Sequence, residues 1–346
     1  MKIIIDAMGG DNAPNSTVGG AVMAAKEFGL DIILVGNEQK ILACLEKEDT
    51  AGVIEHIEIV NAAQELSMCD PATSVTKEKK DSSLAVALRL LGEGKGDALV
   101  ASGNTGAVLV GATMYVKRIR GIRRAALAPI LPTDCGGTLL IDCGANVECT
   151  SEYLMQFAYM GHAFAKRQMK IENPRVGLVN NGAEESKGTP MVKETYELLK
   201  EAGEAGRINF IGNVEGRDIA FGEADIVITD GFTGNVLLKT YEGVGLYFVS
   251  EIKKMFLANF LTKLAALVMK PQLRAFKKKL DYKETGGAPL LGISKPIIKA
   301  HGSCNAYAFR SAIRQAMTYA ESGVIEEITA NIEHMKAAVV EETEKN

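Results

Sequence analysis

Six segments of the sequence combine glycine with side chains that can hold an anion. They are rich in Gly, Asn, Asp, Ser and Thr and carry a rare cation: 6–11, 102–107, 142–146, 180–188, 212–218 and 230–235. Glycine lets backbone N–H groups approach an anion closely, and a helix that begins after such a loop points its positive end towards it. Any one of these segments would suit a plain turn. Together they predict a small, oxygen-rich ligand such as phosphate.

Each of these segments follows a short apolar run that predicts a β-strand. The expected strands are 2–6, 31–35, 57–60, 98–101, 138–142, 176–180, 209–212 and 226–229, with helical patterns between them, among others 17–27, 84–91, 151–170 and 190–201. Continuous apolar runs rich in β-branched residues are typical of parallel strands covered on both faces. The alternation predicts a doubly wound, mostly parallel α/β sheet, in which ligands bind at the carboxyl ends of the strands. We therefore expect the six loops on one edge of one sheet.

The chain is expected to form a single α/β domain over residues 1–346. No linker rich in Pro or Ser divides it, and 47% of its 346 residues are hydrophobic, enough for a large core. Residues 241–282 lack a strand pattern and predict a helical pair that projects from the α/β body. The strand pattern directly after Met1 leaves no room for a leader segment, so we expect a cytoplasmic protein.

Several familiar signatures are missing from the sequence. There is no G-x-x-x-x-G-K-[ST], no G-x-G-x-x-G after the first strand and no G-x-S-x-G. The six cysteines form no C-x-x-C pair, which favours buried reduced thiols over a disulfide framework or a metal site. We expect no cofactor and no metal.

Seven longer motifs carry a resemblance to a known family. In order from Lys2 to Ser303 they are KIIIDAMGGDNAP, ASGNTGA, DCGANV, NNGAEESKG, FIGNVEGRDI, VITDGFTGNVLLK and GGAPLLGISKPIIKAHGS. The chain closely resembles the bacterial phosphate acyltransferases of phospholipid synthesis. One stretch departs from that family: between residues 71 and 83, where it usually carries arginines, this chain has Lys77, Lys79 and Lys80.

The resemblance implies a fold, a reaction and partners. The fold would resemble phosphate acetyltransferases and the isocitrate/isopropylmalate dehydrogenase-like architecture. The reaction would transfer a long-chain acyl group from acyl carrier protein to inorganic phosphate, giving acyl phosphate for phosphatidic acid synthesis. The resemblance further implies a homodimer, peripheral association with the inner face of the cell membrane, and a downstream glycerol-3-phosphate acyltransferase.

This reaction attacks a thioester carbonyl with a phosphate oxygen and expels a thiol. Phosphate is already an anion near neutral pH, so position and charge matter more than a strong base. We expect Lys187 to supply a cation, Asn235 to donate to the carbonyl oxygen, and His301 to protonate the leaving thiolate. Each has a simpler alternative: Lys187 could be a solvated lysine, Asn235 a helix N-cap, and His301 could make a structural hydrogen bond. The residues expected to bind phosphate or the acyl group are Asp6, Gly9, Gly10, Asp11, Ser102, Gly103, Asn104, Thr105, Gly106, Asn146, Asn213, Asp230, Gly231 and Gly234.

Two basic segments interrupt a chain whose net charge is −4. Residues 117–124 hold five cations and no acid, so Arg120, Arg123 and Arg124 are candidates for docking the acidic carrier protein. A solvated helix end is the alternative.

The second basic segment, residues 253–279, holds eight cations and no acid. Phe256, Phe260, Leu264 and Leu267 would share one helix face, which indicates an interfacial helix drawn to anionic lipid. Its apolar part is too short to span a bilayer. A face buried in a dimer interface is the alternative, and nucleic acid is a poorer partner because no aromatic or arginine stripe accompanies the charge.

Two other classes of function stay open at this point. An NAD-dependent β-decarboxylating dehydrogenase shares a related architecture but needs clustered arginines, metal-binding aspartates and a Tyr–Lys pair, which we cannot assemble here. A membrane-bound scaffold would suit the basic helix but leaves the six loops without a purpose.

Overall fold

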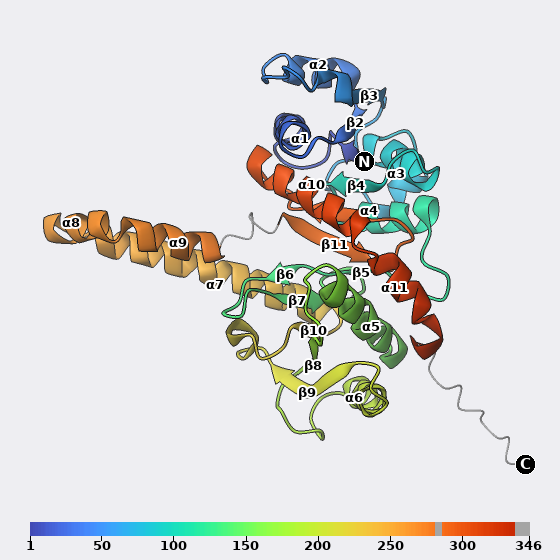
Figure 1. Cartoon of the computed structure of the whole chain (residues 1–346), viewed down its shortest axis with the longest axis vertical. Helices are drawn as coiled ribbons and strands as arrows, with labels where there is room; N and C mark the ends of the chain where they lie inside the picture. The colour runs from blue at the N-terminus through green and yellow to red at the C-terminus, as the bar shows by residue number, and fades with distance from the viewer. Residues whose placement is uncertain (281–285, 336–346) are drawn as a thin grey trace, which may run out of the picture.

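The computed structural model describes residues 1–280 and 286–335, whose strands form two sheets that follow one another along the long axis of the molecule (Figure 1). The first has the order β3-β2-β1-β4-β12-β11-β5 and the second β6-β7-β10-β8-β9. The first sheet comprises β1 (Lys2–Asp6), β2 (Asp31–Gly36), β3 (Ile57–Asn61), β4 (Ala98–Ala101), β5 (Ala126–Leu127), β11 (Gly287–Leu291) and β12 (Ile297–Ala300). The second comprises β6 (Ile130–Leu131), β7 (Thr138–Ile141), β8 (Arg175–Asn180), β9 (Asn209–Glu215) and β10 (Ile226–Ile228).

Helices cover these sheets, as the continuous apolar runs predict. They are α1 (Asn15–Phe28), α2 (Glu38–Leu45), α3 (Ser83–Gly92), α4 (Thr105–Gly111), α5 (Ser151–Arg167), α6 (Pro190–Glu204), α10 (Ala306–Glu321) and α11 (Val324–Ala330). In the first sheet α1 and α10 lie on one face and α3 and α4 on the other (Figure 1). Ile3, Ile4 and Ile5 of β1 are fully buried because both faces are covered. The doubly wound, mostly parallel α/β fold is confirmed.

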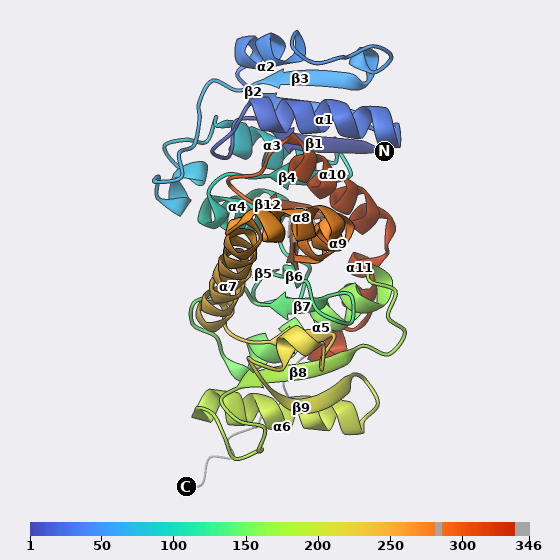
Figure 2. The same cartoon turned by 90° about the vertical axis from the view of Figure 1, so that its left-hand side faces the viewer.

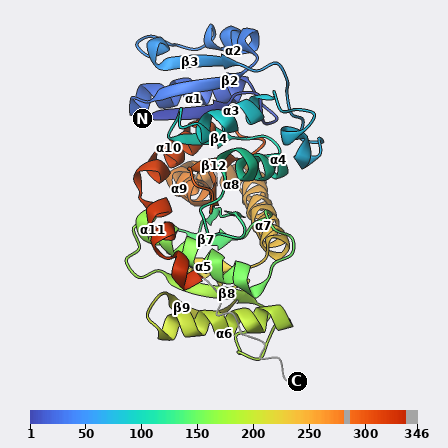
Figure 3. The ribbon, with the colours of Figure 1, turned by 90° about the vertical axis from the view of Figure 1, so that its right-hand side faces the viewer.

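The expectation that all six loops share one sheet is wrong. β1 and β4 belong to the first sheet, whereas β7, β8, β9 and β10 belong to the second. The chain crosses between the sheets at β5 and β6, two-residue strands that pair antiparallel with β11 and β7. It returns to the first sheet through β11 and β12, and α11 then packs on α5 beside the second sheet (Figure 3).

The predicted projecting helices are present, although their layout differs from a simple pair. α7 (Gly231–Leu257) begins directly after β10 and extends beyond both sheets, with α8 (Phe260–Val268) and α9 (Lys270–Leu280) lying along it (Figures 1 and 2). Asn259 is the N-cap of α8, because its side chain accepts from Thr262 N at 3.0 Å. We call α8, α9 and the part of α7 from Gly243 onward the arm; residues 281 and 282 of the predicted excursion lie outside the described residues.

On one face of the first sheet, α1 from the start of the chain packs against α10 from near its end. A Cβ at Gly20 would lie 2.8 Å from Ala306 O and 2.9 Å from Phe309 Cβ. Only glycine lets these two helices approach so closely.

Gly20→Ala should therefore destabilise the protein, although alanine is favoured over glycine in helices by about 1 kcal/mol. The added methyl group must push α10 away, and overpacking of this kind costs about 1–3 kcal/mol. Chemical denaturation measures the change. Gly243→Ala is the matched control, because its Cβ would have no neighbour within 4 Å; equal or greater stability of both variants would contradict the close contact.

Candidate active site

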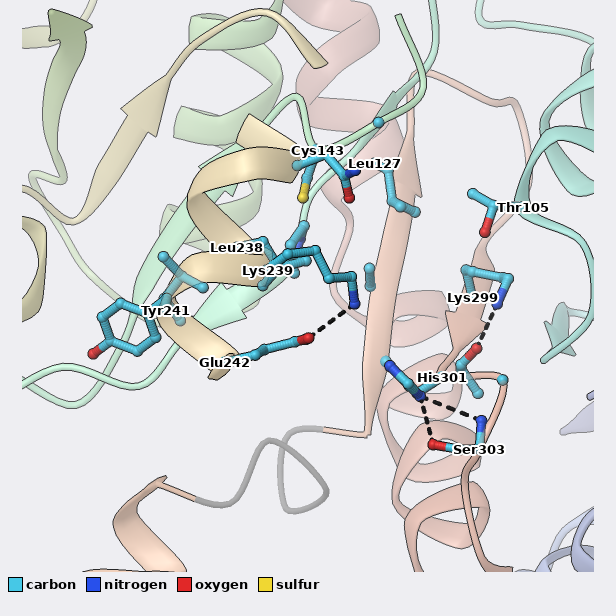
Figure 4. A pocket seen from close by; sticks show the side chains of 18 of the residues that line it. Thr105, Leu127, Cys143, Leu238, Lys239, Tyr241, Glu242, Lys299, His301 and Ser303 are labelled. Carbon is cyan, nitrogen blue, oxygen red and sulfur yellow. Dashed lines mark hydrogen bonds and ion pairs between the residues drawn. The ribbon is translucent and has the colours of Figure 1, made fainter. Parts of the chain in front are cut away.

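A cavity of about 850 Å³ lies between the two sheets, against α7 (Figure 4). One wall comes from loops at the carboxyl ends of first-sheet strands: Asp11, Thr105 and residues 299–303. Another comes from the crossing between the sheets and the loop after β7: Leu127, Pro129, Ile130, Leu131, Pro132, Cys143 and Gly144. α7 contributes one face at helical spacing: Asn235, Leu238, Lys239, Tyr241, Glu242, Gly245, Leu246 and Val249.

The second-sheet side of the cavity is built around the buried carboxylate of Asp142. Its Oδ1 accepts from Leu127 N at 2.8 Å, Cys143 N at 2.7 Å and Ala145 N at 3.3 Å. Its Oδ2 accepts from the backbone N–H and side-chain amide of Asn146 at 2.6 and 3.0 Å. Burial raises the pKa of Asp142, and these donors oppose that effect. One side chain therefore fixes both the crossing strand β5 and the 142–146 loop.

Two glycines seat the start of α7 on this loop. A Cβ at Gly231 would lie 2.5 Å from Asn146 O, and one at Gly234 would lie 2.0 Å from Asp142 O. Asp230 caps the helix, since its Oδ1 accepts from Thr233 N at 2.8 Å. The sequence D-G-F-T-G thus positions α7 so that its next residue, Asn235, enters the cavity.

The first-sheet side depends on a second buried carboxylate, Asp6. A Cβ at Gly9 would lie 2.5 Å from Asp6 Oδ2 and 2.8 Å from Gly103 N, so the loops after β1 and β4 meet where only glycine fits. Ser102 is fully buried and its hydroxyl donates to Gly9 O at 2.5 Å. These contacts fix the loop backbones and leave the Ser102 hydroxyl turned away from the ligand space.

Asn104 is also used by the backbone. It caps α4 by accepting from Ala107 N at 3.0 Å, and its amide donates to Met68 O and Asp70 O at 3.1 and 2.9 Å. The next residue, Thr105, lines the cavity instead.

Two lysines enter the cavity from opposite walls (Figure 4). Lys239 comes from α7, and its Nζ pairs with Glu242 Oε2 at 2.8 Å. Lys299 comes from β12 and is only 8% exposed; its Nζ donates to Ser102 O at 3.3 Å and Ala300 O at 2.7 Å. Burial lowers the pKa of Lys299 to about 8, against the opposing charges of Cys304 and Asp6.

His301, two residues after Lys299, also lines the cavity. Its Nδ1 accepts from Ser303 N at 3.3 Å and lies 3.0 Å from Ser303 Oγ. Because a backbone N–H donates to Nδ1, the neutral ring carries its proton on Nε2. Burial, followed by the charge of Lys239, lowers the pKa of His301, so the ring is neutral at pH 7.

The thiol at the cavity wall is not reactive. Burial and the Asp142 charge raise the pKa of Cys143 to about 12, so this group stays protonated near neutral pH. Among residues 1–280 and 286–335, no group of three or more His, Cys, Asp or Glu side chains is placed to hold a metal ion.

Comparison with known proteins identifies the family. A family model described as "Fatty acid synthesis protein" matches residues 1–327. "Phosphate acyltransferase" of Alkaliphilus oremlandii is 47% identical over 332 residues, covering 96% of this chain and 97% of the relative. The protein of the same name from Thermoanaerobacterium thermosaccharolyticum is 45% identical over 333 residues, covering 96% and 97%. The chain belongs to the phosphate acyltransferase family.

This acyltransferase shares its fold with known phosphotransacetylases. The Streptococcus pyogenes phosphotransacetylase has a TM-score of 0.64 at 16% identity, covering 93% of this chain and 94% of its own. The EutD phosphotransacetylase of Staphylococcus aureus has a TM-score of 0.58 at 15% identity, covering 92% and 94%. At these identities the likeness concerns the fold alone.

The structure brings four of the residues predicted for this acyltransferase into the cavity lining: Asp11, Thr105, Asn235 and His301. The other predicted residues near the cavity do not line it but lie in the adjoining loops and helix starts: Asp6, Gly9, Gly10, Ser102, Gly103, Asn104, Gly106, Asn146, Asp230, Gly231 and Gly234. Asn235 is not a helix N-cap, because Asp230 has that role. Lys187 is exposed on the 180–188 loop and Asn213 donates to Glu184 O at 2.9 Å; neither lines the cavity.

Sequence reasoning missed Asp142, Lys239, Glu242 and Lys299. A signal existed for Lys299, since it is the one charged residue in the apolar run of 297–300. A lysine in a strand covered on both faces has a specific reason to be there. Lys239 and Glu242 have no such signal, because they read as an ordinary surface pair of a helix.

Asp142→Asn should destabilise the protein by about 2–4 kcal/mol, since an amide turns an NH₂ group towards backbone N–H donors and leaves them unpaired. Acyl transfer should fall as well, because the loop that seats α7 is released. Urea unfolding and steady-state rates measure the two effects. Glu148→Gln, an exposed residue after the same loop, is the charge-matched control and should change neither. Wild-type stability of Asp142→Asn would contradict the organising role of this carboxylate.

Proposed function

We propose that this enzyme transfers a long-chain acyl group from acyl carrier protein to inorganic phosphate. The main support for this proposal is that one cavity has a polar part and an apolar part. Lys299, Lys239, His301, Thr105 and Asn235 supply cations and polar donors. The remaining lining is largely apolar: Leu127, Pro129, Ile130, Leu131, Pro132, Leu238, Leu246 and Val249. An anion fits the first part and an alkyl chain the second.

The reaction we propose is a direct displacement. A phosphate oxygen attacks the thioester carbonyl; the C–O bond forms, the C–S bond breaks, and the thiolate leaves with the electron pair. No acyl-enzyme step is assigned, because Cys143 is protonated. The Asn235 amide has no hydrogen-bond partner in the part of the chain that the structure describes and can donate to the developing oxyanion.

His301 is assigned to the same step. A neutral imidazole with its proton on Nε2 is a hydrogen-bond donor at pH 7, and a thiolate leaving group needs little proton transfer. We therefore propose that His301 stabilises negative charge on the oxyanion or the departing sulfur. The role of Lys187 stays a prediction, since its loop lies outside the cavity lining.

The carrier protein would dock on a basic surface. Of the three arginines predicted for this role, Arg123 pairs with Glu152 at 3.0 Å, Arg124 lies 5.6 Å from the Tyr153 ring centroid, and Arg120 is exposed. The bridge between Arg118 and Ile293 places the start of this segment beyond the Leu291 end of β11, and Arg124 at its other end precedes Leu127 of the cavity lining by three residues. Arg124 therefore lies within about 10 Å of the lining, at about 3.3 Å per residue.

The arm is the part of the enzyme that we propose meets a membrane surface, or a second copy of the chain. Phe260, Leu261 and Val268 are 75–80% exposed, with Leu264 and Leu267 beside them. The expected single face is interrupted, because Phe256 lies on α7 and the other residues on α8. No helix in residues 1–280 or 286–335 is long and apolar enough to cross a membrane. A position at the cytoplasmic face would deliver the reactive acyl phosphate to a glycerol-3-phosphate acyltransferase.

Consumption of acyl-carrier thioester should require inorganic phosphate and should give a product that hydroxylamine traps as the hydroxamate. Release of thiol is followed with a chromogenic disulfide, with and without phosphate. Thioester hydrolysis at the same rate without phosphate would refute the proposed reaction. Adding NADH provides a control for the dehydrogenase alternative, which expects its fluorescence to change on binding.

Leu264→Glu should release the enzyme from anionic vesicles, because it places a charge on the apolar face of α8. Each nearby cation contributes about 1 kcal/mol of attraction to such a surface, so salt should weaken binding and neutral vesicles should bind little. Sedimentation with vesicles measures it, with Gln272→Glu on α9 as a control that adds equal charge without removing apolar contact. Undiminished pelleting of Leu264→Glu would contradict the membrane role, and joint loss of activity and dimer would assign the arm to a subunit interface.

A further inference from the structure

Three lysines are candidates to hold phosphate: Lys187, Lys239 and Lys299. Lys239 is half-exposed and already paired with Glu242. Lys187 lies outside the lining. Lys299 is buried, lines the cavity and is enclosed by the loops that carry Ser102, His301 and Thr105. We propose that Lys299 Nζ is the group that binds the phosphate substrate, an inference that rests on the proposed acyl transfer to phosphate.

The hydrogen bonds of Lys299 leave one donor for a ligand. An ammonium group has three N–H bonds in tetrahedral directions. Ser102 O and Ala300 O accept two of them, and no further partner of Nζ occurs among the residues the structure describes. Since the acceptors are the backbone oxygens of Ser102, directly after β4, and of Ala300, the last residue of β12, the two neighbouring strands fix the direction of the third N–H.

Burial favours an anionic partner for Lys299. An ammonium group taken out of water is strongly disfavoured unless an opposite charge compensates it. Within residues 1–280 and 286–335 no carboxylate lies in ion-pair distance of Lys299 Nζ, and the Asp6 carboxylate is engaged at the junction with Gly9 and Gly103. A phosphate dianion in the cavity would supply the missing charge. The Thr105 hydroxyl, which also lines the cavity, can donate to a further phosphate oxygen.

The burial of Lys299 should also make phosphate binding depend on pH. The pKa of Lys299 is lowered to about 8 by burial, with Cys304, Asp6 and Asp11 opposing this and Lys239 adding to it. His301, the other titratable group of this wall, has its pKa lowered and is neutral throughout the alkaline range. Lys299 is therefore charged below about pH 8 and loses its charge above it, while phosphate remains a dianion. Phosphate binding should weaken as the pH rises through this value.

Calorimetric titration of inorganic phosphate into the full-length protein tests the inference. With a pKa of about 8, Lys299 keeps about 3% of its charge near pH 9.5, so wild-type affinity should be up to about 30-fold weaker there than near pH 7. Lys299→Arg should lose much less affinity across this range, because arginine stays charged. Lys299→Met should bind phosphate about 10- to 100-fold more weakly near pH 7, the loss expected for a hydrogen bond to a charged group. Lys295→Met, on the approach to the same strand, is the control.

These measurements distinguish a wrong phosphate ligand from a wrong reaction. If the wild type binds no phosphate at either pH, the proposed function itself fails. If it binds phosphate equally well near pH 7 and pH 9.5, or if folded Lys299→Met keeps wild-type affinity, Lys299 is not the phosphate ligand although the reaction stands. In steady-state kinetics, Lys299→Met should raise the KM for phosphate and leave the KM for the acyl thioester within about threefold. Should Lys299→Met not fold, the wild-type pH profile and Lys299→Arg decide.

Discussion

A buried carboxylate that accepts five hydrogen bonds holds the cavity together. Asp142 binds Leu127 N at the crossing between the sheets, and it binds the 143–146 loop on which Gly231 and Gly234 seat α7. Removing a carboxylate from water is costly, and the dense set of N–H donors offsets that cost only when all of them are in place. The cavity walls are therefore placed as one unit. Asp6 has the equivalent position in the first sheet, between the loops that contain Gly9 and Gly103.

The sequence predicts most of the α/β body because its strands are covered on both faces. All eight predicted strands exist within a few residues of their expected bounds, since continuous β-branched runs leave little choice of structure. The division into two sheets was not predictable. It depends on β5 and β6, which have two residues each, and on the late return through β11 and β12. Such pairings join residues far apart in sequence, and no local pattern records which sheet a strand will enter.

Several of the predicted site residues bond to the backbone of nearby loops. Ser102, Asn104 and Asn146 have side chains that can bind phosphate, yet each serves a nearby backbone group at a distance of 2.5–3.1 Å. Loop Ser and Asn residues commonly satisfy main-chain groups that no strand or helix does. Thr105, Asn235 and the strand lysine Lys299 face the cavity instead, and the described residues offer the side chains of Thr105 and Asn235 no hydrogen-bond partner. A charged residue inside an apolar strand was the stronger signal, because burial gives it no local alternative.

The arrangement of charge supports the direct acyl transfer that we propose, which needs neither a strong base nor a covalent intermediate. The fold itself is shared with phosphotransacetylases, so chemistry must come from the lining and not from the architecture. Here Lys299 and Lys239 approach from opposite walls, one on a first-sheet strand and one on the helix that Asp142 anchors (Figure 4). In the proposed reaction a phosphate dianion bound by Lys299 would also feel the charge of Lys239, although Lys239 is paired with Glu242. Charges fixed to the walls in advance would position this nucleophile without help from a catalytic base.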